Sequence, residues 1–152
     1  MLRDLSSKDL SPVNILMVED DDFEAKSVTR AFRKARLQNT IVRARNGVEA
    51  LEILEGRHAD LSLDWPLIVL IDINMPQMNG HQLIAEIRSR PALKRLVCFM
   101  LTTSTAVADI EQAYDYNVAG YIVKETAGAD FTRLLNLLGD YWLTVQLPRS
   151  GG

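Results

Sequence analysis

Three short runs of apolar residues stand out along the chain, at positions 15–18, 67–71 and 96–101. Each run is apolar throughout, a pattern typical of strands that are buried on both faces of a parallel sheet. Two weaker runs, at 40–44 and 120–123, are further strand candidates. The pattern therefore predicts five strands.

Between these runs the apolar residues recur with the spacing of a helix and share one side of each predicted helix. The predicted apolar sides are formed by Val28, Ala31, Phe32 and Ala35; Val48, Leu51 and Leu54; Leu83, Ile84 and Ile87; Ile110, Ala113 and Tyr114; and Phe131, Leu134, Leu135, Leu138 and Trp142. Strands and helices thus alternate, which predicts an α/β fold: a doubly wound, five-stranded parallel sheet with helices on both faces. The predicted domain spans residues 13–142, between a flexible N-terminal segment (1–12) and a C-terminal extension (143–152).

Composition and charge narrow the possible partners. The 152 residues suit one domain, and the net charge of −3 indicates no basic surface for nucleic acid or membranes. The single cysteine, Cys98, excludes an intrachain disulfide, and the sequence shows neither an apolar leader nor a membrane-spanning run. We expect a cytoplasmic protein that binds neither nucleic acid nor membrane.

Polar residues that can carry chemistry directly follow the predicted strands. Glu19 and Asp20 follow the first strand, Asp72 the third, Thr102 the fourth and Lys124 the fifth. Because the carboxyl ends of parallel strands meet at one edge of the sheet, we expect these side chains to converge there.

The convergent set fits phosphoryl transfer. Three carboxylates supply the oxygen ligands that Mg²⁺ prefers, and Asp72 can act as the nucleophile that forms an aspartyl phosphate. The cation and Lys124 would neutralise charge on the phosphoryl oxygens, and the Thr102 hydroxyl would hydrogen-bond one of them.

Each of these residues also has a simpler interpretation. Acids at 19–22 can form a solvated turn before a helix, where negative charge is favoured, Lys124 can be an exposed strand end and Thr102 a turn residue. Their joint placement favours the functional interpretation.

A phosphatase would need a second acid two residues after the nucleophile, where Asn74 stands, so we expect no turnover enzyme. A binding module that takes no phosphoryl group is the alternative.

Four segments resemble the receiver domains of bacterial two-component response regulators. They are residues 15–20 (ILMVED), 70–80 (LIDINMPQMNG), 101–104 (LTTS) and 120–124 (GYIVK). The resemblance covers residues 13–138. It implies a flavodoxin-like receiver fold and transfer of a phosphoryl group from a partner histidine kinase.

The resemblance also implies a role for each matching residue. Metal ligands would be the side chains of Glu19, Asp20 and Asp72 and the backbone carbonyl of Asn74. Asp72 would accept the phosphoryl group, and Lys124 would neutralise its charge. Thr102 and Tyr121 would form a hydroxyl–aromatic switch that changes the protein surface. The chain departs from the family where Glu125 replaces the usual proline that follows a cis bond. His58 and His81 lack the spacing of metal ligands, and we expect both at the surface.

In three features the chain resembles the short response regulators that partner phytochrome histidine kinases. They are residues 91–95 (PALKR), the non-proline Glu125, and the ending at 141–148 (YWLTVQLP). A different histidine kinase is the alternative partner.

The alternation of apolar and polar residues at 143–147 predicts an extended segment. This segment can pack on its own domain. Alternatively, Leu143, Val145 and Leu147 can pack on a second subunit and form a symmetric homodimer together with the last helix and the fifth strand.

Overall fold

The backbone forms a parallel sheet with the strand order β2-β1-β3-β4-β5. The computed structural model describes residues 13–127 and 131–151, so the predicted flexible segment 1–12 lies outside the described residues. The strands are β1 (Asn14–Val18), β2 (Ile41–Ala44), β3 (Leu67–Ile71), β4 (Val97–Thr102) and β5 (Gly120–Val123). All four strand pairings are parallel, which confirms the predicted fold class.

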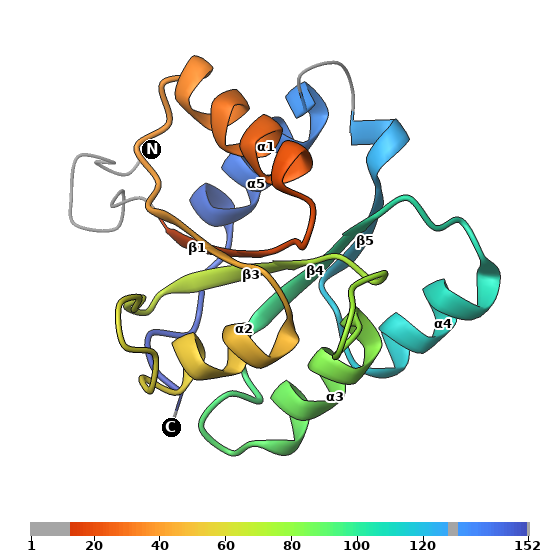
Figure 1. Cartoon of the computed structure of the whole chain (residues 1–152). Helices are drawn as coiled ribbons and strands as arrows, with labels where there is room; N and C mark the ends of the chain where they lie inside the picture. Colours follow the sequence, from red (N-terminus) through yellow and green to blue (C-terminus); the bar gives the residue numbers. More distant parts are fainter. Residues whose placement is uncertain (1–12, 128–130, 152) are drawn as a thin grey trace.

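Helices cover both faces of this sheet (Figure 1). The helices α1 (Asp22–Lys34) and α5 (Thr132–Thr144) lie on one face, and α2 (Gly47–Leu54), α3 (Gly80–Ser89) and α4 (Val107–Asp115) lie on the other. Within β3, Ile68 and Leu70 pack with the α1 and α5 side, whereas Val69 and Ile71 pack with the opposite side. Because both faces are covered, a central strand must be apolar at every position, and this explains its continuous apolar run.

Asparagine and aspartate residues set where several helices begin. The side chain of Asp21 accepts a hydrogen bond from the Glu24 backbone at the start of α1. Asn79 and Gln82 exchange hydrogen bonds at the start of α3, which is a capping box. These caps fix the loops that follow β1 and β3.

Three residues that were predicted on buried helix sides are exposed instead. Val48 is 46% exposed and Tyr114 is 50% exposed, and Ala35 lies just beyond the end of α1. Helix α2 buries Ala50, Leu51 and Ile53, so Val48 faces away from the sheet. Short helices bury a narrow side, and residue spacing alone does not fix its orientation.

The segment after α5 folds back along its own domain. The prediction of an extended segment from 143 was wrong at its start, because α5 continues through Thr144. Leu147 then packs against the core on the α1 and α5 side. Near the chain end, the Arg95 side chain donates a hydrogen bond to the Ser150 carbonyl at 3.3 Å.

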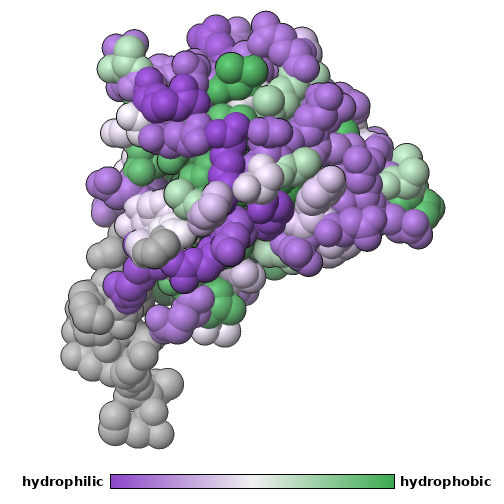
Figure 2. Space-filling model, turned by 90° about the horizontal axis from the view of Figure 1, so that it is seen from below, coloured by the Kyte–Doolittle hydropathy of each residue, from purple (hydrophilic) through white to green (hydrophobic). Residues whose placement is uncertain are grey.

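The surface seen in Figure 2 is mainly hydrophilic, with apolar side chains in small separate groups. In residues 13–127 and 131–151, no helix has the length and apolar character needed to cross a bilayer.

Candidate functional site

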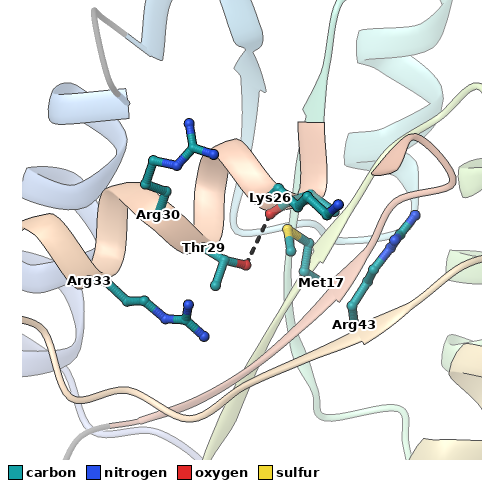
Figure 3. A pocket seen from close by; sticks show the side chains of 7 residues that line it. Met17, Lys26, Thr29, Arg30, Arg33 and Arg43 are labelled. Atoms are coloured by element: carbon teal, nitrogen blue, oxygen red, sulfur yellow. Dashed lines mark hydrogen bonds between the residues drawn. The ribbon is translucent and has the colours of Figure 1, made fainter. Parts of the chain in front are cut away.

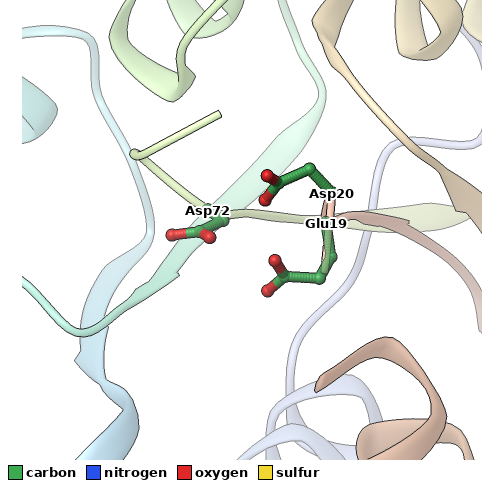
Figure 4. A group of neighbouring side chains, drawn as sticks. All are labelled: Glu19, Asp20 and Asp72. Carbon is green, nitrogen blue, oxygen red and sulfur yellow. The ribbon is translucent and has the colours of Figure 1, made fainter. Parts of the chain in front are cut away.

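Three carboxylates meet at the carboxyl ends of β1 and β3 (Figure 4). Glu19, Asp20 and Asp72 each place one oxygen within 4.8 Å of the others. The pairing of the two strands causes this convergence: Val18 lies opposite Ile71, and the Asp72 N–H donates to the Val18 carbonyl at 3.1 Å. Glu19 and Asp72 are buried, whereas Asp20 is exposed.

Lys124 supplies positive charge at the centre of these acids. Its Nζ lies 2.7 Å from Glu19 Oε1 and 3.5 Å from Asp72 Oδ2, and it also contacts the carboxylate of Glu24 on α1. The lysine follows β5 directly and begins a short 3₁₀ helix, η2 (Lys124–Ala127), so the chain turns at once at Glu125. Sequence reasoning missed Glu24, because its position on α1 gives no chemical signal.

Burial and charge shift two pKa values in this cluster. Burial raises the pKa of Glu19 to about 7; Lys124 opposes this rise and the charge of Asp72 adds to it. Burial opposes the charge of Lys124, yet hydrogen bonds to Glu19 and Glu24 and the charge of Asp72 raise the pKa of Lys124 above its ordinary range. The lysine is therefore a cation throughout the physiological range of pH.

The donor set fits a hard divalent cation. Three carboxylate groups lie together with one lysine, so their negative charge exceeds the local positive charge when all are ionised. Oxygen ligands of this kind suit Mg²⁺, which also keeps several waters. Asn74 is exposed in the loop two residues after Asp72, where its backbone carbonyl would complete the set.

Glycine at position 80 brings α3 against the backbone of Asp72. A Cβ atom at Gly80 would lie 2.4 Å from the Asp72 carbonyl oxygen, closer than real Cβ contacts allow. The Gly80 N–H also donates to the Ile73 carbonyl at 2.9 Å. The start of α3 is therefore docked directly on the backbone of Asp72.

Thr102 and Tyr121 meet at the loop between β4 and α4. Thr102 is fully buried, and its hydroxyl oxygen accepts a hydrogen bond from the Ser104 N–H at 3.4 Å. The Tyr121 hydroxyl donates to the Ser104 carbonyl at 3.0 Å. Burial raises the pKa of Tyr121, so the phenol stays protonated and remains a donor. Ser104 thus links the two residues of the predicted switch.

A basic groove lies between α1 and β2 (Figure 3). It has a volume of about 410 Å³ and is lined by Met17, Ala25, Lys26, Thr29, Arg30, Arg33 and Arg43. Arg43 connects the groove to the acidic site, because its Nε donates to the Glu19 carbonyl at 2.9 Å and its Nη1 to Asp22 at 2.5 Å. Arg43 therefore holds the loop that presents Glu19 and Asp20, a role that the sequence pattern did not reveal.

The expectation that His81 lies at the surface was wrong. His81 is 7% exposed, and its Nε2 lies 2.9 Å from Asp109 Oδ1. It occupies the first turn of α3, directly after Gly80, and that turn is packed against the loop of Asp72. The spacing between histidines excludes some metal sites but carries no information about whether a histidine is buried.

The fold and the convergent acids agree with a family comparison. Residues 15–136 match the response regulator receiver domain family, and the chain belongs to this family. It is thus the receiver domain of a two-component response regulator. Receiver domains of this kind are typically not turnover enzymes.

Two individual proteins are similar to the chain over most of its length. FilR2, a probable methanogenesis regulatory protein of Methanothrix harundinacea, is 32% identical over 132 residues, which cover 87% of this chain and 84% of FilR2. Response regulator Rcp1 of Synechocystis is 28% identical over 147 residues, which cover 96% of this chain and 100% of Rcp1.

Solved structures agree with the sequence relatives. A structure of the Mn²⁺-bound form of response regulator Rcp1 matches with a TM-score of 0.75 and 29% identity, covering 90% of this chain and 99% of that one. The phosphorylated cyanobacterial phytochrome response regulator RcpA matches with a TM-score of 0.74 and 29% identity, covering 91% and 99%. The chain is thus similar to phytochrome response regulators.

The contact between Gly80 and Asp72 leads to a stability prediction. Gly80→Ala forces a Cβ into the Asp72 backbone, and we expect a loss of about 1–3 kcal/mol in the free energy of unfolding. Gly139→Ala in α5 is the control, because a Cβ there meets nothing within 4 Å and alanine should stabilise the helix by about 0.5–1 kcal/mol. Urea unfolding of both variants tests this, and an unchanged Gly80→Ala protein would contradict the tight packing.

Proposed function

We propose that Asp72 accepts a phosphoryl group from a phosphohistidine of a partner histidine kinase. One carboxylate oxygen of Asp72 attacks phosphorus, so that an O–P bond forms while the P–N bond breaks and its electron pair stays on the imidazole nitrogen. The observation that carries the proposal is the buried Asp72 carboxylate, which lies beside two further acids and 3.5 Å from the Lys124 ammonium.

Mg²⁺ would be held by Glu19, Asp20, Asp72 and the backbone carbonyl of Asn74. When bound, the cation would offset negative charge on the transferring phosphoryl oxygens. The proposal is supported by the all-oxygen donor set within 4.8 Å and by the description of the similar Rcp1 structure as Mn²⁺-bound.

Lys124 and Thr102 would contact the attached phosphoryl group. Lys124 would exchange part of its contact with Glu19 for a phosphoryl oxygen, and the Thr102 hydroxyl would donate to another. Tyr121, which bonds to the same loop, would carry this change to the surface around α4 and β5. The output would be an altered surface for contact with another protein. The net charge of −3 favours a protein partner over nucleic acid or a membrane, which would attract a basic surface.

A small phosphodonor tests the acceptor role. Incubation of the wild-type chain with acetyl phosphate and Mg²⁺ should add the mass of one phosphoryl group, measured on the intact protein. Asp72→Asn should take none, because an amide cannot act as the nucleophile. Asp60→Asn, an exposed aspartate in the loop before β3, is the matched control and should behave as wild type. Absence of added mass in the wild-type chain would instead support a receiver that acts only as a binding module.

We propose a phytochrome-type histidine kinase as the phosphoryl donor. Support comes from RcpA, which is described as a phytochrome response regulator and is 29% identical over 91% of this chain. FilR2, at 32% identity, is described as a methanogenesis regulator and favours the alternative of another kinase.

Phosphotransfer rates distinguish these two donors. Transfer from a purified, autophosphorylated phytochrome-type kinase should be at least about tenfold faster than from an unrelated histidine kinase, because specific docking surfaces discriminate between partners. The rates can be followed by the radiolabel that reaches the chain. Equal rates would exclude phytochrome specificity and leave the acceptor role of Asp72 intact.

We further propose that the receiver domain, residues 13–142, ends in an extension that contacts a second copy of the chain. Leu143 is 57% exposed and Val145 is 36% exposed at the end of α5, whereas Leu147 packs on its own domain. The interface would therefore use Leu143 and Val145 with α5 and β5, and Leu147 would fix the direction of the extension.

Light scattering tests the homodimer. The double substitution Leu143→Ser and Val145→Ser should shift the measured mass from dimer to monomer, because it removes the exposed apolar contacts. Val48→Ser is the matched control, since Val48 is 46% exposed but lies on α2, on the opposite face of the sheet. A wild-type monomer, or a dimer that persists in the double variant, would defeat the proposal.

A further inference from the structure

A continuous set of hydrogen bonds runs from Thr102 to the start of α4. The Thr102 hydroxyl oxygen accepts from the Ser104 N–H at 3.4 Å. The Ser104 hydroxyl donates to Asp109 Oδ2 at 2.6 Å and accepts from the Ala106 N–H at 3.3 Å. The Tyr121 hydroxyl donates to the Ser104 carbonyl. Both residues of the proposed switch therefore depend on the position of Ser104.

His81 extends this set to α3. Its Nε2 lies 2.9 Å from Asp109 Oδ1, and hydrogen bonds from Ser104 and His81 lower the pKa of Asp109. Because an ionised carboxylate only accepts hydrogen bonds, Nε2 of His81 carries the proton and donates it. Asp109 thus receives one donor from the β4–α4 loop and one from α3.

Packing alone does not account for His81. Its Nδ1 is buried without a hydrogen-bond partner in the described part of the chain, and such an atom costs about 1–3 kcal/mol. An apolar side chain would fill the same space without this cost. The histidine is explained by what its other nitrogen does, which is to hold Asp109.

The packing of α3 on the Asp72 backbone brings this set of hydrogen bonds back to the proposed phosphoacceptor. His81 follows Gly80, whose missing side chain allows α3 to pack on the Asp72 carbonyl. The path therefore runs from Asp72 through α3 to Asp109, and from Asp109 through Ser104 to Thr102. It connects the two sides of the site along a route that lies outside the acid cluster.

The order of the side chains excludes a hydrolase triad. Asp109 lies between Ser104 and His81, so the histidine contacts the carboxylate rather than the serine hydroxyl. A nucleophilic serine needs a base in contact with its hydroxyl. The arrangement is suited to holding a loop.

We propose that His81 and Asp109 are positioning residues for phosphoryl transfer at Asp72. They fix Ser104 so that its N–H occupies one lone pair of the Thr102 hydroxyl, which leaves the hydroxyl proton free to donate to a phosphoryl oxygen. Without His81 the β4–α4 loop loses its anchor on α3, and the Thr102 hydroxyl loses its fixed direction. The inference rests on the proposed acceptor role of Asp72.

The test compares the rate of phosphorylation with the affinity for Mg²⁺. The full chain is incubated with acetyl phosphate and Mg²⁺, the rate is followed by intact mass, and Mg²⁺ binding is measured by calorimetry. His81→Leu should lower the rate about 3- to 10-fold, which corresponds to the loss of one orienting hydrogen bond. Its Mg²⁺ affinity should be unchanged, because the acids are untouched. A general folding defect would weaken both.

Two further variants make the result specific. His81→Gln keeps an N–H donor at similar reach and should restore most of the rate. Ser104→Ala removes the next hydrogen bond at a half-buried position, so it should reproduce the loss even if His81→Leu folds poorly. His58→Leu is the matched control, because His58 also pairs with a carboxylate, Glu49 on α2, at 3.2 Å.

Several outcomes would overturn the inference. They are a wild-type rate in both His81→Leu and Ser104→Ala, a loss that His81→Gln does not restore, or an equal loss in His58→Leu. A wild-type chain that takes no phosphoryl group would defeat the proposed function itself, and the inference with it. A normal wild-type rate with normal His81 and Ser104 variants defeats the inference alone.

Discussion

The concentration of negative charge at one edge of the sheet is the constraint on which the rest of the structure depends. Because β1 and β3 are adjacent, parallel and end at the same level, the carboxylates that follow them lie close together. These are the carboxylates of Glu19, Asp20 and Asp72. Lys124 offsets part of this charge through contacts with Glu19 and Asp72. The remaining excess makes the edge a favourable place for a divalent cation, as the proposed phosphoryl transfer requires.

Contacts to the backbone also hold these acids in place. Arg43 bonds to the Glu19 carbonyl from β2, and the glycine at position 80 lets α3 rest on the Asp72 carbonyl. Such contacts leave the carboxylate oxygens available for a ligand. They also explain why residues without reactive groups are needed close to the site.

The site draws on both helical layers. Lys124 reaches α1 through Glu24 on one face of the sheet, and the loop after β4 reaches α3 through Asp109 and His81 on the other. A change at Asp72 can therefore affect the helices on both faces of the sheet. This arrangement suits the proposed output of the receiver domain, which is a change of its surface.

The sequence by itself determined the five strands and the convergence of Glu19, Asp20, Asp72 and Lys124. Strands buried on both faces must be apolar throughout, and parallel strands must end at one edge, so both features can be read from the order of residues. Only the tertiary structure decided the burial of His81, the exposure of Val48 and Tyr114, and the roles of Glu24, Arg43 and Asp109. These depend on how each helix is rotated against the sheet and on contacts between residues far apart in the chain, such as His81 with Asp109, 28 positions away. Local spacing carries no information about either.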